Sequence, residues 1–201
     1  MNTPRSTPRP RYDFHSAIEK AKKLSGPSGT YRAGVWDPEH SSALGVVVTS
    51  WSHLEEKFLY IFHSICRGTN QRVSRIVFRS LVQDSRIRIS RYILENSPTH
   101  YAASTELDDI IDEFDSCNSV RNKFVHGMWY THDSGRIYLS PANEDPTLPG
   151  THRRLVPLKE ITDLITRMVE LQRRISRRQF ADLMLSAKAS QPSPENPPSA
   201  A

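Results

Sequence analysis

The sequence predicts a mainly all-α fold, a bundle of four to five helices with a small β-hairpin inserted before the last helix. Apolar residues recur at spacings of three and four over most of the chain, which is the period of a helix that buries one face. Between 129 and 139 the pattern changes to two short strand-like segments around a His-Asp-Ser-Gly turn, which predicts the hairpin. No internal repeat of about 20–50 residues is visible, so the pattern does not indicate a solenoid.

Length and composition are typical of a globular protein. The 201 residues suffice for one domain, and 37% hydrophobic with 24% charged residues exclude a wholly disordered chain. The longest apolar runs, such as 44–48, are far shorter than the ~20 residues that span a bilayer. Residues 1–11 lack the apolar core of a secretory signal. Two cysteines without a CxxC spacing predict reduced thiols, so we expect a cytoplasmic protein with no membrane partner.

Charge and motif content narrow the function. Lys and Arg number 27 against 22 Asp and Glu, a net charge of +5, and 20 of the 27 are Arg. Arg offers a planar fork of donors to phosphate, so this bias indicates a nucleic-acid partner, although basic proteins without such a partner are also common. GxGxxG, GxxxxGK and HExxH motifs are missing, so we expect no cofactor and no metal.

The predicted elements divide the chain into four segments. Residues 1–11 and 189–201 are rich in Pro and are expected to be disordered tails. Residues 12–42 are expected to form a short helix at 12–24, followed by a loop at 25–42 that packs Tyr31, Val35 and Trp36 onto the body. Residues 43–188 form the bundle. Its predicted helices span 43–66, 70–82, 84–96, 104–127 and 157–188, with the hairpin at 129–139 and a loop at 140–156.

The first two helices of the bundle are predicted from their apolar seams. In 43–66 the seam repeats at spacings of 4, 3, 4, 3 and 4, and a glycine at 68 ends the helix. In 70–82 we expect apolar residues to turn inward and three arginines to share another face. The first seam is Val47, Trp51, Leu54, Phe58, Ile61 and Ile65; the second inward set is Val73, Ile76, Val77 and Leu81; the arginines are Arg72, Arg75 and Arg79.

The other helices are predicted from their seams and their ends. Pro98 stops the third helix, 84–96, because the residue before a proline disfavours the helical conformation. The fourth, 104–127, opens with Ser and Thr caps and acidic residues and closes at Gly127. The last begins at Pro157, which a first helical turn accepts. The apolar residues are Ile87, Ile89, Ile93 and Leu94 in the third helix; Leu107, Ile110, Ile111, Phe114, Phe124 and Val125 in the fourth; and Leu158, Ile161, Leu164, Ile165, Met168, Leu171 and Ile175 in the last.

The most informative stretch is the end of the fourth helix, from Asn118 to His126. Helical spacing places Asn118, Asn122 and His126 in one polar column, and the long side chain of Arg121 can reach the same patch. Arginine can bind two phosphate oxygens, histidine can give or take a proton near neutral pH, and an amide can orient either group. Because RNA supplies its own nucleophile, the 2′-hydroxyl, such a cluster can cleave a phosphodiester without a metal.

A structural role for these residues is the alternative. Arg121 would then pair with an acidic neighbour, and His126 would cap helix carbonyl groups. Glu55 and Glu56 on the first helix offer a similar choice, since they either orient Arg121 or His126 or form ion pairs of their own.

The run Arg121-Asn-Lys-Phe-Val-His126 resembles the Rx4–6H signature of the HEPN superfamily in its R-N-x-x-x-H form. The Trp-x-x-Leu-Glu segment from Trp51 to Glu55 is also similar to many bacterial members, and the resemblance covers about residues 43–185. It implies a helical bundle that forms a homodimer with two motifs beside one cleft. It further implies a metal-independent endoribonuclease, used as a toxin, in phage defence or in RNA processing, with Arg121 and His126 catalytic and Asn122 in support. The hairpin and the long last helix lie outside the minimal family pattern.

The leading hypothesis is therefore a homodimeric ribonuclease that cleaves RNA by 2′-hydroxyl attack, with an antitoxin or regulatory protein as a further partner. Asn118 and Glu55 are the supporting candidates, and Arg72, Arg75, Arg79 and Lys123 are the candidates for RNA binding. Further arginines that could follow an RNA backbone are Arg86, Arg88, Arg91, Arg173, Arg174, Arg177 and Arg178. Two alternatives stay open: a non-catalytic interaction or nucleotide-binding module, and, with less support, a DNA-binding regulator.

Overall fold

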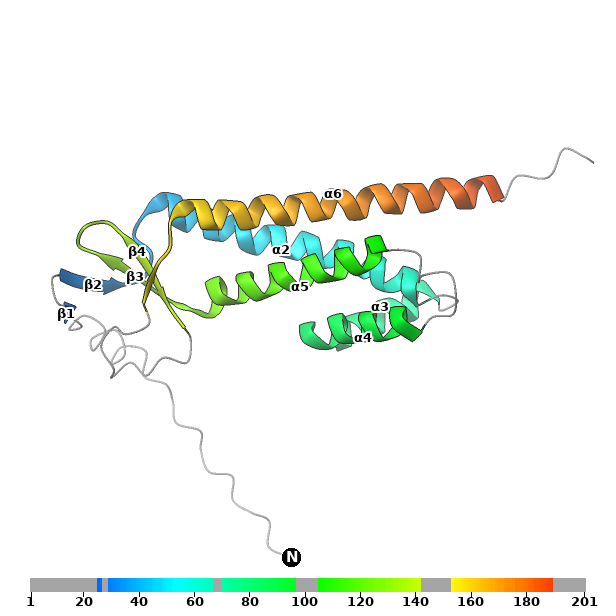
Figure 1. Ribbon diagram of the computed structural model, residues 1–201, viewed down its shortest axis with the longest axis horizontal. Coiled ribbons are helices and arrows are strands. Elements are labelled where there is room, and N and C mark those ends of the chain that lie inside the picture. Colours follow the sequence, from blue (N-terminus) through cyan, green and yellow to red (C-terminus); the bar gives the residue numbers. More distant parts are fainter. Residues whose placement is uncertain (1–24, 27–28, 67–69, 97–104, 142–152, 190–201) are drawn as a thin grey trace, which may run out of the picture.

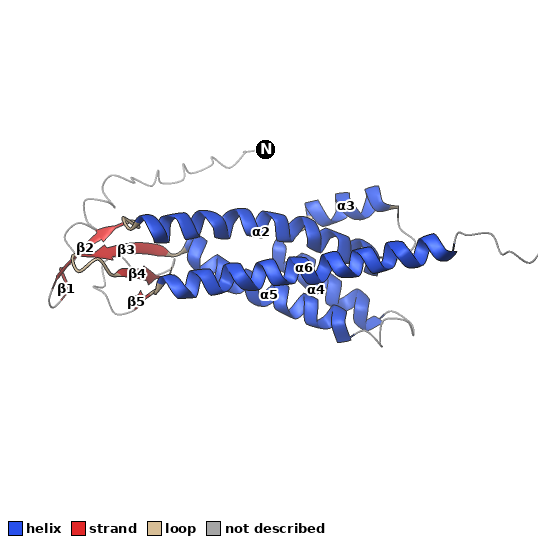
Figure 2. Ribbon diagram, turned by 90° about the horizontal axis from the view of Figure 1, so that it is seen from above, coloured by secondary structure: helices blue, strands red, loops and turns tan. Residues whose placement is uncertain are grey.

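The computed structural model describes residues 25–26, 29–66, 70–96, 105–141 and 153–189, and within them the predicted mainly helical fold is confirmed (Figure 1). Within these ranges five helices form an elongated bundle, and a small antiparallel sheet lies at one end of it (Figure 2). The predicted helix at 12–24 and both predicted tails, apart from residue 189 at the end of the last helix, lie outside the described residues. The helices are α2 (Pro38–Ile65), α3 (Gln71–Ser80), α4 (Gln83–Asn96), α5 (Thr105–His126) and α6 (Leu158–Ala189).

The two longest helices, α2 and α6, run side by side in the same direction away from the sheet (Figures 1 and 2). Midway along them the Gln172 side-chain amide donates to the carbonyl oxygen of Ser50 at 2.9 Å. Further from the sheet the Tyr60 hydroxyl donates to an Asp182 carboxylate oxygen at 2.5 Å. Helix α5 runs back toward the sheet, so its C-terminal end meets the starts of α2 and α6 (Figure 1).

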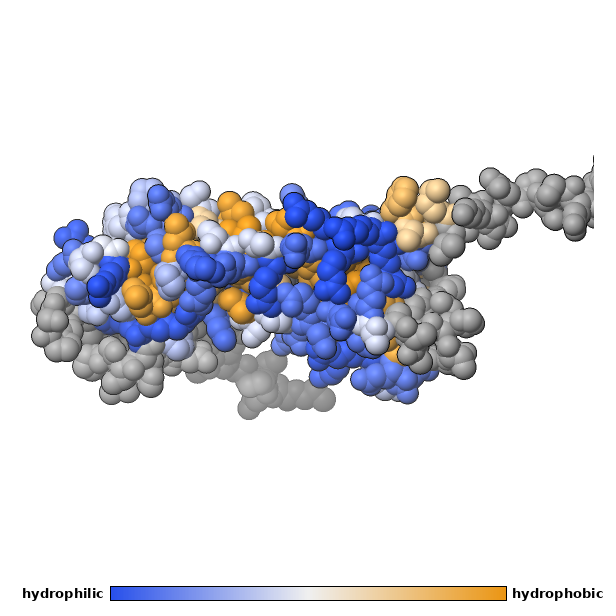
Figure 3. Space-filling view, turned by 45° about the horizontal axis from the view of Figure 1, so that its top comes forward, coloured by the Kyte–Doolittle hydropathy of each residue, from blue (hydrophilic) through white to orange (hydrophobic). Residues whose placement is uncertain are grey.

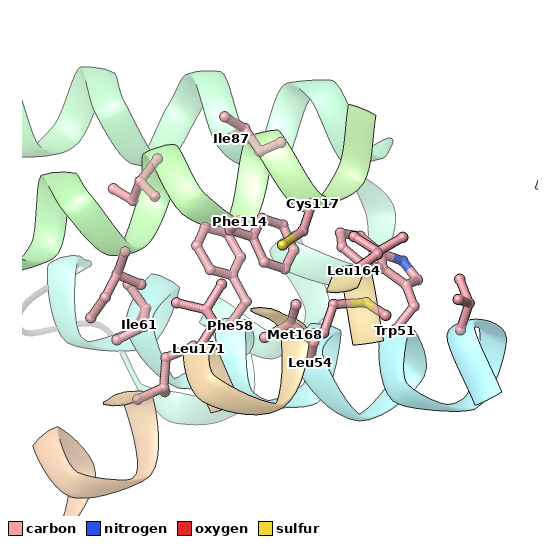
Figure 4. Packing of buried hydrophobic residues seen from close by; sticks show 14 of the residues in the cluster. Trp51, Leu54, Phe58, Ile61, Ile87, Phe114, Cys117, Leu164, Met168 and Leu171 are labelled. Carbon is pink, nitrogen blue, oxygen red and sulfur yellow. The ribbon is translucent and has the colours of Figure 1, made fainter. Parts of the chain in front are cut away.

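Aromatic rings fill the middle of the core between α2, α5 and α6 (Figure 4). Phe58 of α2 and Phe114 of α5 stack with ring centroids 3.8 Å apart, and Trp51 also stacks on Phe114 at 4.9 Å. All three side chains are almost completely buried. Met168 and Leu171 of α6 close this layer from the third side, as the sequence predicted.

Helix α2 begins five residues earlier than the sequence analysis predicted. Asp37 is its N-cap: a side-chain oxygen accepts a hydrogen bond of 2.9 Å from the backbone N–H of His40, which also holds the pKa of Asp37 below its usual range. Pro38 occupies the first helical turn, where its missing N–H costs nothing. The residues 37–39 thus form a helix start inside the segment that was predicted to be a loop.

Helix α3 is rotated relative to the prediction. Val73, Ile76 and Val77 point outward, with 50%, 61% and 41% of their surfaces exposed, whereas Ser74 and Phe78 are buried. Phe78 packs against two phenylalanines of α2, Phe58 and Phe62. The short helix therefore turns its one aromatic side chain inward, onto the aromatic rings of α2, and leaves its aliphatic side exposed.

The predicted hairpin is the centre of a larger sheet. Strands β3 (Met128–His132) and β4 (Ile137–Ser140) pair as predicted, with Gly135 in the turn at a φ of 78°. The other strands are β1 (Ser25–Gly26), β2 (Gly29–Ala33) and β5 (Arg154–Leu155), and the order is β1-β2-β3-β4-β5. The predicted loops at 25–42 and 140–156 therefore both contribute strands, and Trp36, expected to pack on the body, is 70% exposed.

Gly127 joins α5 to the sheet at a point with no room for a side chain. A Cβ atom at this residue would lie 2.5 Å from Leu139 Cδ1 and 2.5 Å from the carbonyl oxygen of Lys123. The Gly127 N–H itself donates to that carbonyl at 3.0 Å. Glycine therefore lets β4 approach the last turn of α5 closely, which fixes the sheet relative to the helix end.

We expect Gly127→Ala to lower the free energy of unfolding by about 1–3 kcal/mol, because the added methyl group must displace Leu139 or the helix end. Gly45→Ala is the matched control. Gly45 lies within α2, where an added Cβ atom would have nothing within 4 Å, so we expect that variant to be unchanged or stabilised by up to about 1 kcal/mol. Urea unfolding followed by circular dichroism measures both, and equal stability of the two variants would contradict the close packing at Gly127.

Candidate functional site

The residues singled out at the end of α5 line one open pocket of about 320 Å³. Asn118, Arg121, Asn122 and His126 form the α5 side of this pocket, as their helical spacing predicted. Asn118 is 4% exposed, whereas His126 is exposed at the end of the helix. The polar column therefore runs from a buried amide at the inner end to a solvent-accessible imidazole at the rim. The opposite side of the pocket is formed by Trp51, Glu55, Val82, Gln83 and Asp84.

Arg121 lies over Trp51 of α2, with its guanidinium carbon 5.8 Å from the ring centroid. Its Nη1 donates to the side-chain oxygen of Asn122 at 2.9 Å, and its buried Nε has no hydrogen-bond partner among the described residues. Among the described residues no carboxylate forms an ion pair with Arg121. The acidic partner that a structural role requires is therefore not found in that part of the chain, and the cation stays available to an anionic ligand.

The end of α5 is capped without His126. The Trp129 indole N–H donates to the carbonyl oxygen of Phe124 at 2.7 Å, and Gly127 N–H donates to that of Lys123. No hydrogen bond joins the His126 ring to another residue of the described ranges. These contacts leave the imidazole at the pocket rim, where it can exchange a proton with a bound molecule.

Glu55 lies in the pocket wall but is held by another arginine. Arg86 of α4 donates from Nη1 to Glu55 Oε1 at 2.7 Å and to Gln83 Oε1 at 2.9 Å. The same side chain donates from Nε to the carbonyl of Phe78 at 2.8 Å and lies over the Phe78 ring. The ion pair that the sequence analysis offered as an alternative for Glu55 is thus the one observed. It offsets one negative charge beside Arg121 and leaves Asp84 as the other carboxylate of the pocket wall.

The predicted RNA-binding arginines of α3 do not line this pocket. Arg79 forms an exposed ion pair with Glu56 at 2.8 Å, and Arg75 lines a separate hollow with Tyr60 and His63. Arg72 is exposed on α3, as is Lys123 on α5. Of the wider set of arginines, Arg91 pairs with Asp112 and Asp115, and Arg178 pairs with Glu106.

Sequence reasoning missed the far wall of the pocket. Val82, Gln83 and Asp84 come from the connection between α3 and α4 and the start of α4, which carry no motif and reach the site only because α4 packs on α5. Trp51 was assigned to the core, and it is buried, yet its ring also supports Arg121. The nearest signal in the sequence was the Trp-x-x-Leu-Glu segment, which brings both Trp51 and Glu55 to the site.

Cys117 is a buried packing residue one turn before Arg121. Its side chain is fully buried and lies in the same layer as Phe114 (Figure 4). Burial raises the pKa of the Cys117 thiol to about 12, although Arg167 acts in the opposite direction. The thiol is therefore neutral at physiological pH and is no nucleophile for the pocket.

No protein-family model, curated protein or solved structure matches the chain. The described helices include none that is long and apolar enough to cross a membrane. Within the described ranges no three His, Cys, Asp or Glu side chains are grouped as a metal site would need. In the view of Figure 3, most of the surface of the helical part is hydrophilic, and apolar side chains are exposed at several places.

The Glu55–Arg86 pair predicts a difference between two arginines that both contact α2. We expect Arg86→Met to lower the free energy of unfolding by about 2 kcal/mol or more, because it leaves the partly buried Glu55 carboxylate without this ion pair and removes one donor to the Phe78 carbonyl, which keeps its bond from the Leu81 N–H. Arg79→Met, at a pair that is 59% exposed on both sides, should cost less than about 1 kcal/mol. Chemical unfolding of both variants makes the comparison, and equal losses would contradict a structural role for Arg86.

The raised pKa of Cys117 predicts that native protein resists alkylation at this residue. At pH 8, iodoacetamide should leave Cys117 unmodified in the folded state and modify it fully in urea, since only an exposed thiolate reacts. Peptide mass spectrometry reads the modification at Cys117 and at the partly exposed Cys66 separately. Rapid labelling of Cys117 in folded protein would show that the core around Phe114 opens readily.

Proposed function

We propose that this chain is a metal-independent endoribonuclease of the HEPN type, in which Arg121 and His126 act on RNA. One observation carries the proposal. Arg121 and His126 share an open pocket with Asn118 and Asn122, while no described carboxylate pairs with the cation and no described residue bonds to the imidazole. The resemblance of the R-N-x-x-x-H run to the HEPN signature supports the same assignment.

The reaction uses a nucleophile that the substrate brings. The 2′-hydroxyl oxygen of the ribose attacks the adjacent phosphorus and loses its proton, and the bond from phosphorus to the 5′-oxygen breaks. That oxygen takes up a proton, which leaves a 2′,3′-cyclic phosphate and a 5′-hydroxyl. Arg121 binds the non-bridging phosphate oxygens and stabilises the charge that develops on them. His126 moves a proton at one of the two reacting oxygens, and Asn122 orients the Arg121 guanidinium.

This chemistry favours a homodimer. One proton leaves the 2′-oxygen and another reaches the 5′-oxygen, on opposite sides of the phosphorus. A single imidazole at the pocket rim serves one of these positions, and arginine does not release a proton near neutral pH. A second copy would supply the other imidazole. The HEPN resemblance also implies a cytoplasmic toxin, phage-defence or RNA-processing role, with an antitoxin or regulatory protein as a partner in that role.

RNA cleavage in EDTA tests the proposal. Wild-type protein should cut mixed-sequence single-stranded RNA into fragments with 2′,3′-cyclic phosphate ends, which mass spectrometry identifies. Arg121→Ala and His126→Ala should each lower the rate by about 100-fold or more, because each removes a group that acts in the transition state.

Two variants serve as matched controls. His53→Ala and Lys159→Ala remove an exposed histidine and an exposed lysine outside the pocket, and both should keep the wild-type rate. Inert wild-type protein, or full activity of folded Arg121→Ala and His126→Ala, would refute the catalytic proposal.

The outward apolar side of α3 favours the second candidate, a non-catalytic interaction module. Val73, Ile76 and Val77 expose aliphatic surface that a partner protein could cover. Intact RNA after incubation with folded wild-type protein, both in EDTA and with Mg²⁺, would favour this candidate over the nuclease.

A further inference from the structure

The outer face of the sheet gathers aromatic side chains. In the antiparallel register Tyr31 pairs with His132, and Tyr130 pairs with Tyr138. Successive residues of a strand point to opposite faces, so these four side chains share one face. Ile137 and Leu139 alternate with them and are buried on the other face, where Leu139 joins the helical core.

The rings on this outer face contact one another. Tyr31 lies edge-on to His132, with centroids 4.9 Å apart, and edge-on to Tyr138 at 5.3 Å. Tyr31, His132 and Tyr138 keep part of their surface exposed, whereas Tyr130, beneath Arg153, is 5% exposed. Arg153, just before β5, places its guanidinium carbon 4.6 Å from the centroid of Tyr31 and 4.3 Å from that of Tyr130. The buried Nε of Arg153 has no hydrogen-bond partner in the part of the chain that the structure describes.

The charge of the sheet is complementary to a polyanion. Residues 29–36, 128–141 and 153–156 hold four arginines against one acidic residue, Asp133. An oxygen of that carboxylate already accepts a hydrogen bond from the backbone N–H of Thr30 at 3.1 Å. An array of partly exposed rings with a stacked arginine and an excess of positive charge is the chemistry that binds the bases and phosphates of single-stranded nucleic acid.

The sheet also follows His126, the proposed catalytic histidine, directly along the chain. His126 ends α5 and Met128 begins β3, so their Cα atoms lie within about 7 Å of each other. The close packing at Gly127 keeps this junction in one geometry. The sheet therefore lies next to His126, within reach of RNA that extends past this side chain.

We infer that the outer face of the sheet is a base-stacking surface for single-stranded RNA that extends beyond the pocket. The inference rests on the proposed nuclease function for its choice of RNA. Tyr31, His132 and Tyr138 stack on bases, and Arg153 binds phosphate. Because every base offers a flat face, such a surface tolerates any sequence and selects unpaired over double-stranded RNA.

Binding to the full chain carrying His126→Ala tests the inference without cleavage. Fluorescence anisotropy in EDTA measures the affinity for a labelled, mixed-sequence single-stranded RNA of about 12 nucleotides. Adding Tyr138→Leu should weaken binding about tenfold, whereas Tyr138→Phe, which keeps the ring, should bind as the parent does. Circular dichroism confirms that each variant is folded.

A pair of arginine variants separates the two faces of the sheet. Arg153→Gln on the outer face should weaken binding and reduce its salt dependence. Arg32→Gln removes the same charge from the opposite face, because Arg32 pairs with Thr131, and should have a much smaller effect. Equal losses from the two variants would overturn the inference.

The remaining outcomes separate this inference from the nuclease proposal. Equal affinity of the Tyr138→Leu variant and its parent, no binding by the parent, or equal affinity for duplex RNA would each overturn the stacking surface, even if wild-type protein cuts RNA. Ring-dependent binding by a chain whose wild-type form cuts no RNA would support the surface and refute the nuclease.

Discussion

The packing of Phe114 on α5 against Trp51 and Phe58 on α2 is the interaction on which the rest of the structure depends. It fixes the rotation of α5 about its own axis, because the three large rings stack with centroids 3.8 Å and 4.9 Å apart. The same rotation turns Asn118 and Arg121, one and two turns further along α5, toward the pocket. Trp51 contacts both Phe114 and the Arg121 guanidinium, so one side chain links the core to the site. A site placed in this way on packed helices keeps its geometry before any ligand arrives.

Ion pairing distinguishes Arg121 from the other arginines that approach α2. Arg86 and Arg79 each have a glutamate partner on that helix. By taking Glu55, Arg86 also limits the negative potential that would otherwise lie opposite Arg121. The pocket thus contains a cation without a described counterion, above a buried aromatic ring, and its partial burial strengthens the attraction for an anion.

Much of the helical fold was predictable because it follows from periodicity. The seams of α2, α4, α5 and α6 were found from spacing alone, and the residues of the α2 seam are all buried. The start of α2 was missed although Asp37 and Pro38 form a standard helix-start signal. The rotation of α3 could not be read from its pattern, because it depends on the contact of Phe78 with Phe58 and Phe62 of another helix, α2. Strands β2 and β5 were missed because each is short and gains its hydrogen bonds from strands distant in the sequence, β3 and β4.

The sequence by itself determined the local facts: which segments are helical, where α5 ends, and that an amide, a cation and an imidazole share one side of that end. These depend on contacts within a few residues, and the chain order fixes them. Only the tertiary structure decided which side chains face those residues and which partners they take. The far wall of the pocket is formed by the connection between α3 and α4 and by the first residues of α4. Glu55 forms its ion pair with an arginine that lies 31 residues away in the chain. Such pairings depend on how the helices pack, and spacing along one helix does not encode them.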